Sequence, residues 1–418
     1  MKIKYQKFLA ITTLLALVFG TFVPSALAFT SAEILGNGAG SENEVEVEKE
    51  QETVVVQDNW AEVKNVVNAR VVSGGNEANG NTNGEVFVGT GAATANINLN
   101  TKVNSNVAKV EDCDGCEEEI KAKISGNGAD SENEIEMEFE SDVSVFQENK
   151  AKIENSVCAK AVSGENEANA NTGDDVAILT GDATVNTNVN NQANANVTKV
   201  GDDSFEFEND GFVSAEILDN GAWTENEIEI EHRRSVLVSQ ENVAYIMNKI
   251  KAEALSGKNK AKYNTNGEVV IDTGAATANL NLNNKANFNF AKVECCELEL
   301  WSKIAGNGAD TENEVEFKQA EFLSVFQNGG DNDKEKAAFL SNWLAAKPVS
   351  GLNSASDNTD PDKVDPVIVT GPATANVNVN NESGANVYGS KDSQPEAPDW
   401  PQFSFEFDFG KVWGFFFR

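Results

Sequence analysis

A fourfold internal repeat constrains this chain more than any other feature of its sequence. The motif T-G-x-A-T-x-N occurs at residues 90–96, 180–186, 273–279 and 370–376. A second motif, G-N-G-A or D-N-G-A, precedes each copy and recurs roughly every 90 residues. The asparagines that mark the two motifs are Asn37, Asn127, Asn220 and Asn307, and Asn96, Asn186, Asn279 and Asn376. A fixed period of this kind is the signature of a repeat protein.

The segment after each T-G has the alternation of a β-strand. In the second copy, asparagines at 186, 188 and 190 alternate with Thr187 and Val189. Successive side chains of a strand point to opposite faces, so we expect one apolar face and one row of asparagines. An aliphatic residue two positions before each T-G is expected in the core: Val88, Ile178, Ile271 and Ile368. The glycines of the motif, Gly91, Gly181, Gly274 and Gly371, are expected in turns with positive φ.

Two all-β architectures fit these patterns. Landmarks such as Asn37, Gln57, Asn76 and Asn96 lie about 20 residues apart, which favours a β-solenoid-like array whose coils stack and whose amide side chains form ladders. The alternative is a row of tandem β-sandwich domains, since about 100 residues is their usual size. We expect repeat units at 29–118, 119–210, 211–298 and a degenerate fourth at 299–388.

Both ends of the chain differ from the repeats. Residues 1–28 predict a signal peptide, with Lys2, Lys4 and Lys7 before an apolar run and an A-x-A cleavage pattern at its end. Residues 389–401 contain three prolines and predict a linker. Residues 402–418 form an aromatic tail, for which we keep two interpretations: a strand that caps the last coil, or an anchor at a membrane interface or a signal for the export machinery.

Part of the sequence resembles a known group of proteins. The segments S-V-F-Q-E-N at 144–149 and S-V-L-V-S-Q-E-N at 235–242 resemble the Gln/Asn-rich repeats of curlin, and the chain as a whole resembles secreted Asn/Gly-rich β-repeat surface proteins of bacteria. The glycine that usually follows the glutamine of curlin repeats is missing after Gln147 and Gln240. The resemblance implies an extracellular, self-associating structural role.

Acidic residues provide candidate ligands for a Ca²⁺ site. The formal net charge is −35, which disfavours a nucleic-acid partner. Glutamates alternate with apolar residues after each G-N-G-A motif and predict either a solvated strand face or oxygen ligands for Ca²⁺. An aspartate-rich loop follows in the fourth unit. The candidate ligands are Glu134, Glu136, Glu138, Asp360, Asp362 and Asp365.

The remaining residues give little support for catalysis. The only histidine, His232, is expected on an exposed rim. Export would permit a disulfide between Cys113 and Cys116, whereas a zinc site would need two such pairs close together. We therefore expect no cofactor and a non-catalytic structural or adhesive protein that is secreted and associated with the cell surface. Expected partners are a second copy or a surface glycan. The alternatives are a glycan- or Ca²⁺-binding module and, third, a polysaccharide-acting enzyme. Exposed tryptophans would be candidate sugar contacts: Trp60, Trp223, Trp301 and Trp343.

Overall fold

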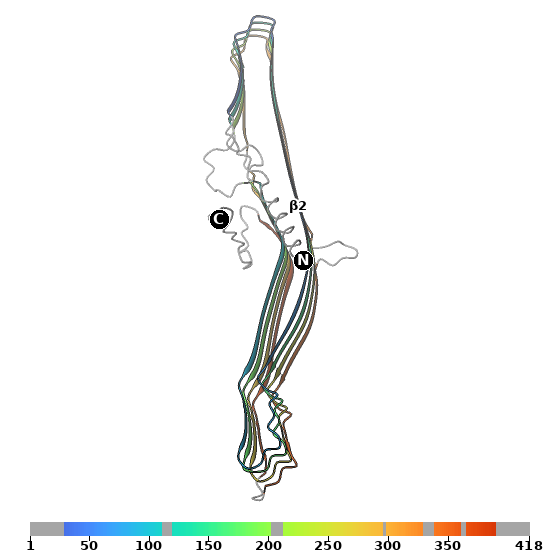
Figure 1. Cartoon of the computed structure of the whole chain (residues 1–418). Helices are drawn as coiled ribbons and strands as arrows, with labels where there is room; N and C mark the ends of the chain where they lie inside the picture. Colours follow the sequence, from blue (N-terminus) through green and yellow to red (C-terminus); the bar gives the residue numbers. More distant parts are fainter. Residues whose placement is uncertain are drawn as a thin grey trace, which may run out of the picture.

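The chain folds into a flat stack of four long β-coils, seen in a computed structural model (Figure 1). The structure describes residues 29–110, 119–201, 212–295, 298–328, 338–360 and 365–389. The predicted signal peptide, the predicted linker beyond residue 389, the aromatic tail, Cys113, Cys116 and Asp362 lie outside these ranges. All the elements in the described ranges are strands.

Each repeat unit makes one complete coil, which we call a rung. A short strand runs to one end of the molecule, a long strand runs to the other end, and two further strands return; the long strand has 31 residues in rungs 1 to 3 and is divided into β15 and β16 in rung 4. At about 3.3 Å per residue the long strand spans on the order of 100 Å. The strands of rung 1 are β1 (Phe29–Leu35), β2 (Glu42–Val72), β3 (Val86–Thr90) and β4 (Ala93–Val110).

The next three rungs repeat this path. Rung 2 contains β5 (Glu119–Ser125), β6 (Glu132–Val162), β7 (Val176–Thr180) and β8 (Ala183–Val200). Rung 3 contains β9 (Phe212–Leu218), β10 (Glu225–Leu255), β11 (Lys260–Lys262), β12 (Val269–Thr273) and β13 (Ala276–Val293). Rung 4 contains β14 (Glu299–Ala305), β15 (Glu312–Asn328), β16 (Ala338–Val349), β17 (Ser354–Ser356), β18 (Val367–Thr370) and β19 (Ala373–Gly389).

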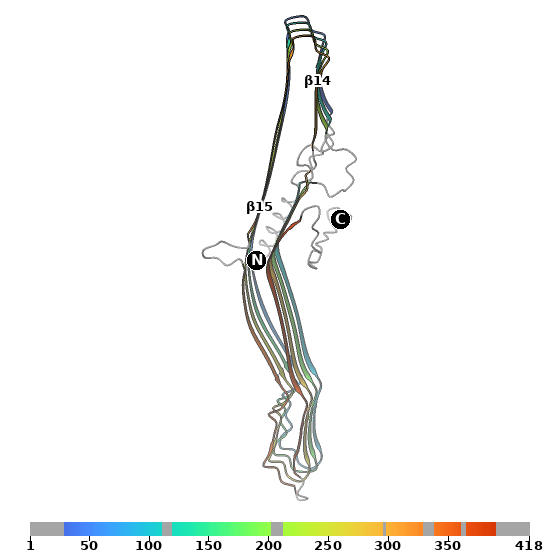
Figure 2. The ribbon, with the colours of Figure 1, turned by 180° about the vertical axis from the view of Figure 1, so that it is seen from behind.

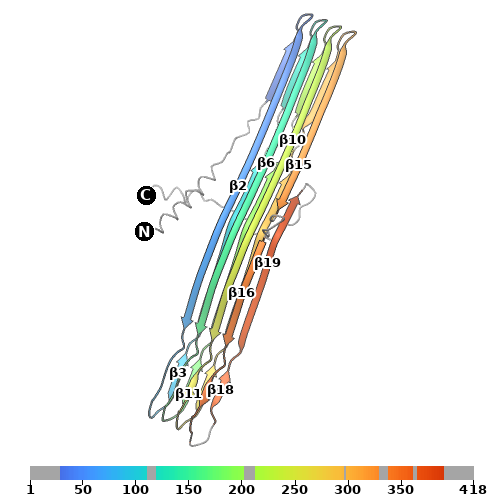
Figure 3. The ribbon, with the colours of Figure 1, turned by 90° about the vertical axis from the view of Figure 1, so that its right-hand side faces the viewer.

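Equivalent strands of successive rungs pair in parallel, so the fold is a β-solenoid-like array and not a row of sandwiches. The sheet orders are β1-β5-β9-β14, β3-β7-β12-β18 and β4-β8-β13-β19, while β15 and β16 both pair with β10 in the sheet of the long strands (Figures 2 and 3). In register, Glu42 lies beside Glu132 and Ala93 beside Ala183. The coil is therefore the whole unit of about 90 residues, and the expectation of coils of about 20 residues is wrong.

Two sheet layers enclose the apolar core. Alternate residues of β6 point inward and pack against the inward residues of β8 in one half of the molecule and of β5 in the other. Val88, Ile178 and Ile271 are buried as predicted, whereas Ile368 of rung 4 is exposed because no rung covers it. The alternation predicted for β8 is present: Thr187 and Val189 are buried and the asparagines between them face outward.

Columns of amide side chains cross the interior from rung to rung. In one column, Asn149 Nδ2 donates to Asn242 Oδ1 at 3.0 Å, and in another Asn196 Nδ2 donates to Asn289 Oδ1 at 3.1 Å. The two columns are also joined across the layers, since Asn149 Nδ2 donates to Asn196 Oδ1 at 2.6 Å. Buried amides are costly unless they are hydrogen-bonded. These ladders satisfy the amides only when equivalent residues stack, so they fix the register of the rungs.

A reversal of alternation in the return strand brings asparagines into the interior. Asn194 has a φ of 61° and, like Asn287 beside it, is left out of the pairing of β8 with β13, while the register on either side is unchanged. Before it, Ala193 faces inward; after it, Asn196 and Thr198 face inward. The equivalent positions Asn104, Asn287 and Gly384 also have positive φ, so every rung contains this shift.

The motif glycines are required by the distance between rungs and not by their dihedral angles. Gly91, Gly181, Gly274 and Gly371 do not have positive φ, so that expectation is wrong. A Cβ on Gly181 would lie 2.6 Å from the backbone nitrogen of Ala92 in the rung before it. The glycines that follow the long strands are under the same constraint: a Cβ on Gly164 would lie 2.0 Å from the Gly257 carbonyl oxygen of the next rung. Only glycine lets the rungs approach this closely.

His232 is buried, which corrects the expectation of an exposed rim. Only 2% of its surface is exposed, and it lies in β10 between Phe139 of rung 2 and Gln319 of rung 4. It follows Ile228 and Ile230 at period two on the inward face of the strand. The alternation of the sequence therefore places His232 inside the stack.

Candidate functional site

The return strands β4, β8, β13 and β19 carry a grid of outward-facing asparagines along one face of the stack. One column consists of Asn96, Asn186, Asn279 and Asn376, and the next consists of Asn98, Asn188, Asn281 and Asn378. Side chains of both columns line a groove of about 750 Å³. The groove crosses all four rungs because every rung contributes the same two positions.

Hydrogen bonds within each column hold the amides in a fixed orientation. Asn186 Nδ2 donates to Asn96 Oδ1, and Asn279 Nδ2 donates to Asn186 Oδ1, both at 2.8 Å. In the second column Asn281 Nδ2 donates to Asn188 Oδ1 at 2.8 Å. An amide group has two N–H donors and an oxygen with two lone pairs. Asn186, Asn279 and Asn281, which both donate and accept within their columns, thus keep one donor and one acceptor for a ligand, and their side chains are uncharged.

The G-N-G-A asparagines form a further column at the opposite end of the molecule. The backbone N–H of Asn37 donates to Asn127 Oδ1 at 2.9 Å, and that of Asn127 donates to Asn220 Oδ1 at 3.0 Å. The backbone N–H of Asn220 continues the column to Asn307 Oδ1 at 3.0 Å. These side chains stabilise the tight turn before the long strand, and their role is structural.

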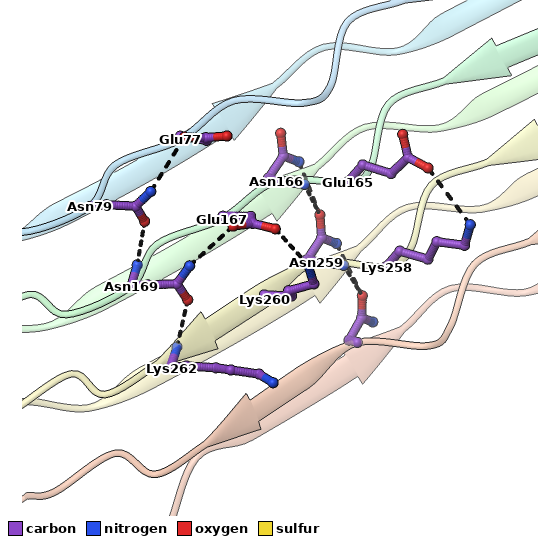
Figure 4. Close-up of polar contacts among 11 residues, drawn as sticks. Glu77, Asn79, Glu165, Asn166, Glu167, Asn169, Lys258, Asn259, Lys260 and Lys262 are labelled. Atoms are coloured by element: carbon purple, nitrogen blue, oxygen red, sulfur yellow. Dashed lines mark hydrogen bonds and ion pairs between the residues drawn. The ribbon is translucent and has the colours of Figure 1, made fainter.

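The turn that follows each long strand, at the other end of the molecule, combines amide columns with ion pairs (Figure 4). Asn166 Nδ2 donates to Asn259 Oδ1 at 3.0 Å, while Lys260 Nζ lies 2.6 Å from Glu167 Oε1 of the adjacent rung. The backbone N–H of Lys262 donates to Asn169 Oδ1 at 3.0 Å. These ion pairs are exposed, and exposed pairs contribute little stability, so the amides determine how the turn stacks.

The predicted acidic residues form an outward-facing array on the long-strand sheet. Glu134 of rung 2 lies between Glu44 and Glu227 in register, and Glu136 lies between Glu46 and Glu229. Glu138 follows on the same face. Asp360 and Asp365 lie in rung 4, away from this array. Among the described residues, no group of three or more His, Cys, Asp or Glu side chains is arranged to hold a metal ion.

The pKa values of two glutamates in this array are raised. For Glu134 the main cause is burial, followed by repulsion from Glu227 and Glu44. For Glu136 it is again burial, followed by repulsion from Glu229 and Glu46. Both effects disfavour the charged carboxylate. The array therefore opposes the stacking of rungs when its members are ionised.

This electrostatic cost predicts that mild acid stabilises the fold. A group whose folded-state pKa is raised contributes stability that is fully present below its unfolded pKa and is lost as the pH rises through the folded pKa. We expect the melting temperature to rise as the pH falls from about 7 to about 5. The variant Glu134→Gln/Glu136→Gln should melt higher than the parent at neutral pH and show a smaller rise. A pH series of thermal melts tests this, with Glu85→Gln as a control outside the array. An equal rise in parent and variant would contradict it.

The other predicted functional residues are not brought together. The four tryptophans are exposed but lie in β2 (Trp60), the turn before β10 (Trp223), β14 (Trp301) and β16 (Trp343). Lys249 Nζ lies 5.5 Å from the ring centroid of Trp343. Cys158 is free and exposed on β6, and Cys295 is disulfide-bonded. The described ranges contain no helix with the length and apolar character needed to cross a membrane.

Sequence reasoning identified the asparagine rows but not the groove between them. The groove depends on two adjacent columns at matching heights, and those follow only from the register of about 90 residues. A search against protein-family models, curated proteins and solved structures found no match to this chain.

Proposed function

We propose that this protein is an exported, non-catalytic structural or adhesive component of a bacterial cell surface or extracellular matrix. The observation that carries the proposal is the set of amide ladders that run through every rung. Such ladders use most of the interior polar groups to hold successive coils in register. They make a long, regular scaffold with polar faces, which suits a structural protein. The signal-peptide pattern of residues 1–28 supports export.

Surface location can be tested on intact cells. We expect a membrane-impermeant amine-reactive label to modify the protein on living cells that produce it, because exposed lysines such as Lys152 and Lys260 line the outer faces. A cytoplasmic enzyme of the same cells should stay unlabelled. Deletion of the gene should weaken adhesion or matrix cohesion. Recovery of the chain only from the cytoplasm would contradict the proposal.

The asparagine groove favours glycan binding as a second candidate function. A neutral lining with fixed donors and acceptors matches a ligand rich in hydroxyl groups, each of which donates and accepts, and the groove volume lies in the range of ligand sites. Isothermal titration with cellohexaose and chitohexaose tests this. We expect binding that is lost in Asn188→Leu/Asn281→Leu, and that survives in Glu134→Gln/Glu136→Gln on the other face. No heat of binding for either sugar would remove this candidate.

A further inference from the structure

We propose that rung 1 of one molecule stacks on rung 4 of another, so that copies join head to tail into a filament. The partner in this proposal is a second copy of the same chain, which would extend the structural role proposed above. Filament formation does not depend on whether the protein lies at the cell surface. Four features of the two ends of the stack support it: the unpaired strands, the exposed interior residues, the glycines and the charges.

Among the described strands, those of rungs 1 and 4 pair on one side only, and their free edges match each other. Rung 4 is joined to rung 3 by the same parallel register that joins rung 2 to rung 1. Each step repeats the last, so the free edge of rung 4 presents the backbone groups that rung 3 presents to it. A contact between two different surfaces of one chain that does not close into a ring generates an open polymer.

Interior residues of rung 4 are exposed where their counterparts in rung 3 are buried. Leu323 is 52% exposed, whereas Val236 beside it is 3% exposed. Val377 and Val379 of β19 are 47% and 45% exposed. Others with the same position are Val315, Phe317 and Ile368. A stacked copy would place Val45, Val88 and Ile97 of its rung 1 over this set, which removes apolar surface from water.

Glycines persist at both ends, where a single molecule does not need them. A Cβ on Gly257 would lie 1.9 Å from the Gly351 carbonyl oxygen of the next rung, but a Cβ on Gly351 itself would have no atom within 4 Å. At the other end, a Cβ on Gly38 or Gly91 would also have no atom within 4 Å. None of the three has positive φ. A further rung against each end would require glycine at all three positions.

Two charged columns bring opposite charges together at the contact, although the columns of Glu42, Glu44 and Glu46 end in rung 4 at glutamates and repel a stacked copy. The column of Glu48 ends in rung 4 at Lys318, so a stacked copy would place its Glu48 beside Lys318. The column of Lys102 ends at Glu382, and Lys285 Nζ already lies 3.1 Å from Glu382 Oε2 within the stack. A stacked copy would place its Lys102 on the other side of that carboxylate. Complementary charge favours this register over a shifted one.

One residue at the free edge of rung 4 weakens the contact. The Val349 carbonyl accepts from Ser256 of rung 3, so by alternation Pro348 faces the free edge, where it supplies no N–H. The contact between copies therefore has fewer backbone bonds than contacts within a copy.

Sedimentation velocity of the purified chain over a range of concentrations tests the proposal. We expect the parent to form larger species as its concentration rises. Gly351→Ala should block the rung 4 end and Gly38→Ala/Gly91→Ala the rung 1 end, and each variant alone should stay monomeric with the melting temperature of the parent monomer. An equimolar mixture of the two should form a dimer and nothing larger, since each supplies the end that the other lacks.

The controls separate this mechanism from other forms of association. Ser156→Ala, on the lateral face of β6, should assemble like the parent. A parent that stays monomeric at every concentration, a Gly351→Ala variant that assembles like the parent, or a chain that assembles only after residues 390–418 are removed would each overturn the proposal. None of these results would bear on surface location, which the labelling of intact cells tests separately.

Discussion

Replacing Gly164 by alanine is expected to destabilise the fold by about 3 kcal/mol or more, the upper end of the cost of overpacking an interior. The new Cβ would lie 2.0 Å from the Gly257 carbonyl oxygen and 2.5 Å from that of Ser256. Both are backbone atoms of the next rung, so no side chain can move aside. The two rungs must separate there, and the adjacent hydrogen bonds of the turn are lost with them.

Gly351→Ala is the matched control, because Gly351 holds the same position in rung 4 and its Cβ would meet no atom. Urea unfolding of both variants at a concentration where the chain is monomeric measures the difference. The midpoint for Gly164→Ala should fall well below that of the parent, while Gly351→Ala should unfold with it. Equal midpoints for the two variants would mean that the rungs are not spaced as the structure has them.

The second large effect is expected for Asn196→Leu. Asn196 is fully buried, and its Oδ1 accepts from Asn106 Nδ2 at 3.1 Å and from Asn149 Nδ2 at 2.6 Å. Leucine has a similar size but no polar group, so these two donors lose an acceptor. Both nitrogens keep other acceptors, such as the Glu148 carbonyl for Asn106 and Asn242 Oδ1 for Asn149, so we expect a loss of about 1–3 kcal/mol, the cost of one unsatisfied buried group.

Asn186→Leu provides the comparison for this prediction. Asn186 lies on the same strand and belongs to a column of the same kind, but it faces outward. Water can replace its lost bonds, so we expect a change within about 0.5 kcal/mol, as for other surface substitutions. Chemical denaturation of both variants gives the result. If both lost the same stability, the interior column would contribute no more than the exterior one.

The sequence predicted the class of the fold but not the size of its coil. Asn37, Gln57, Asn76 and Asn96 are spaced by about 20 residues, yet in the structure they belong to one rung. Each begins its own column, and Gln57, for example, is joined to Gln147 of rung 2. Equal spacing along a rung does not stack residues. Only the pairing partners distinguish the period of the landmarks from the period of the stack.

The fourth unit illustrates how far the landmarks could be followed. Their drift in the sequence corresponds to the ladder from Asn259 to Asn353, which spans 94 residues, and that from Asn279 to Asn376, which spans 97. The insertions lie between strands, so the columns continue through them. The buried asparagines were harder to predict, because the positive φ of Asn194 reverses the alternation within one strand. A left-handed asparagine in a polar strand has no distinctive sequence signal.

The central claim is that units of about 90 residues stack as single coils, and zero-length cross-linking of the native chain tests it most directly. A carbodiimide joins a lysine to a carboxylate that it contacts. The structure predicts products between Lys152 and Glu62, Lys260 and Glu167, and Lys318 and Glu229, at separations of 90, 93 and 89 residues. Pairs two residues apart occur in any strand and are set aside. Products dominated by pairs about 20 residues apart, or by pairs within one unit, would contradict the stacked-coil fold.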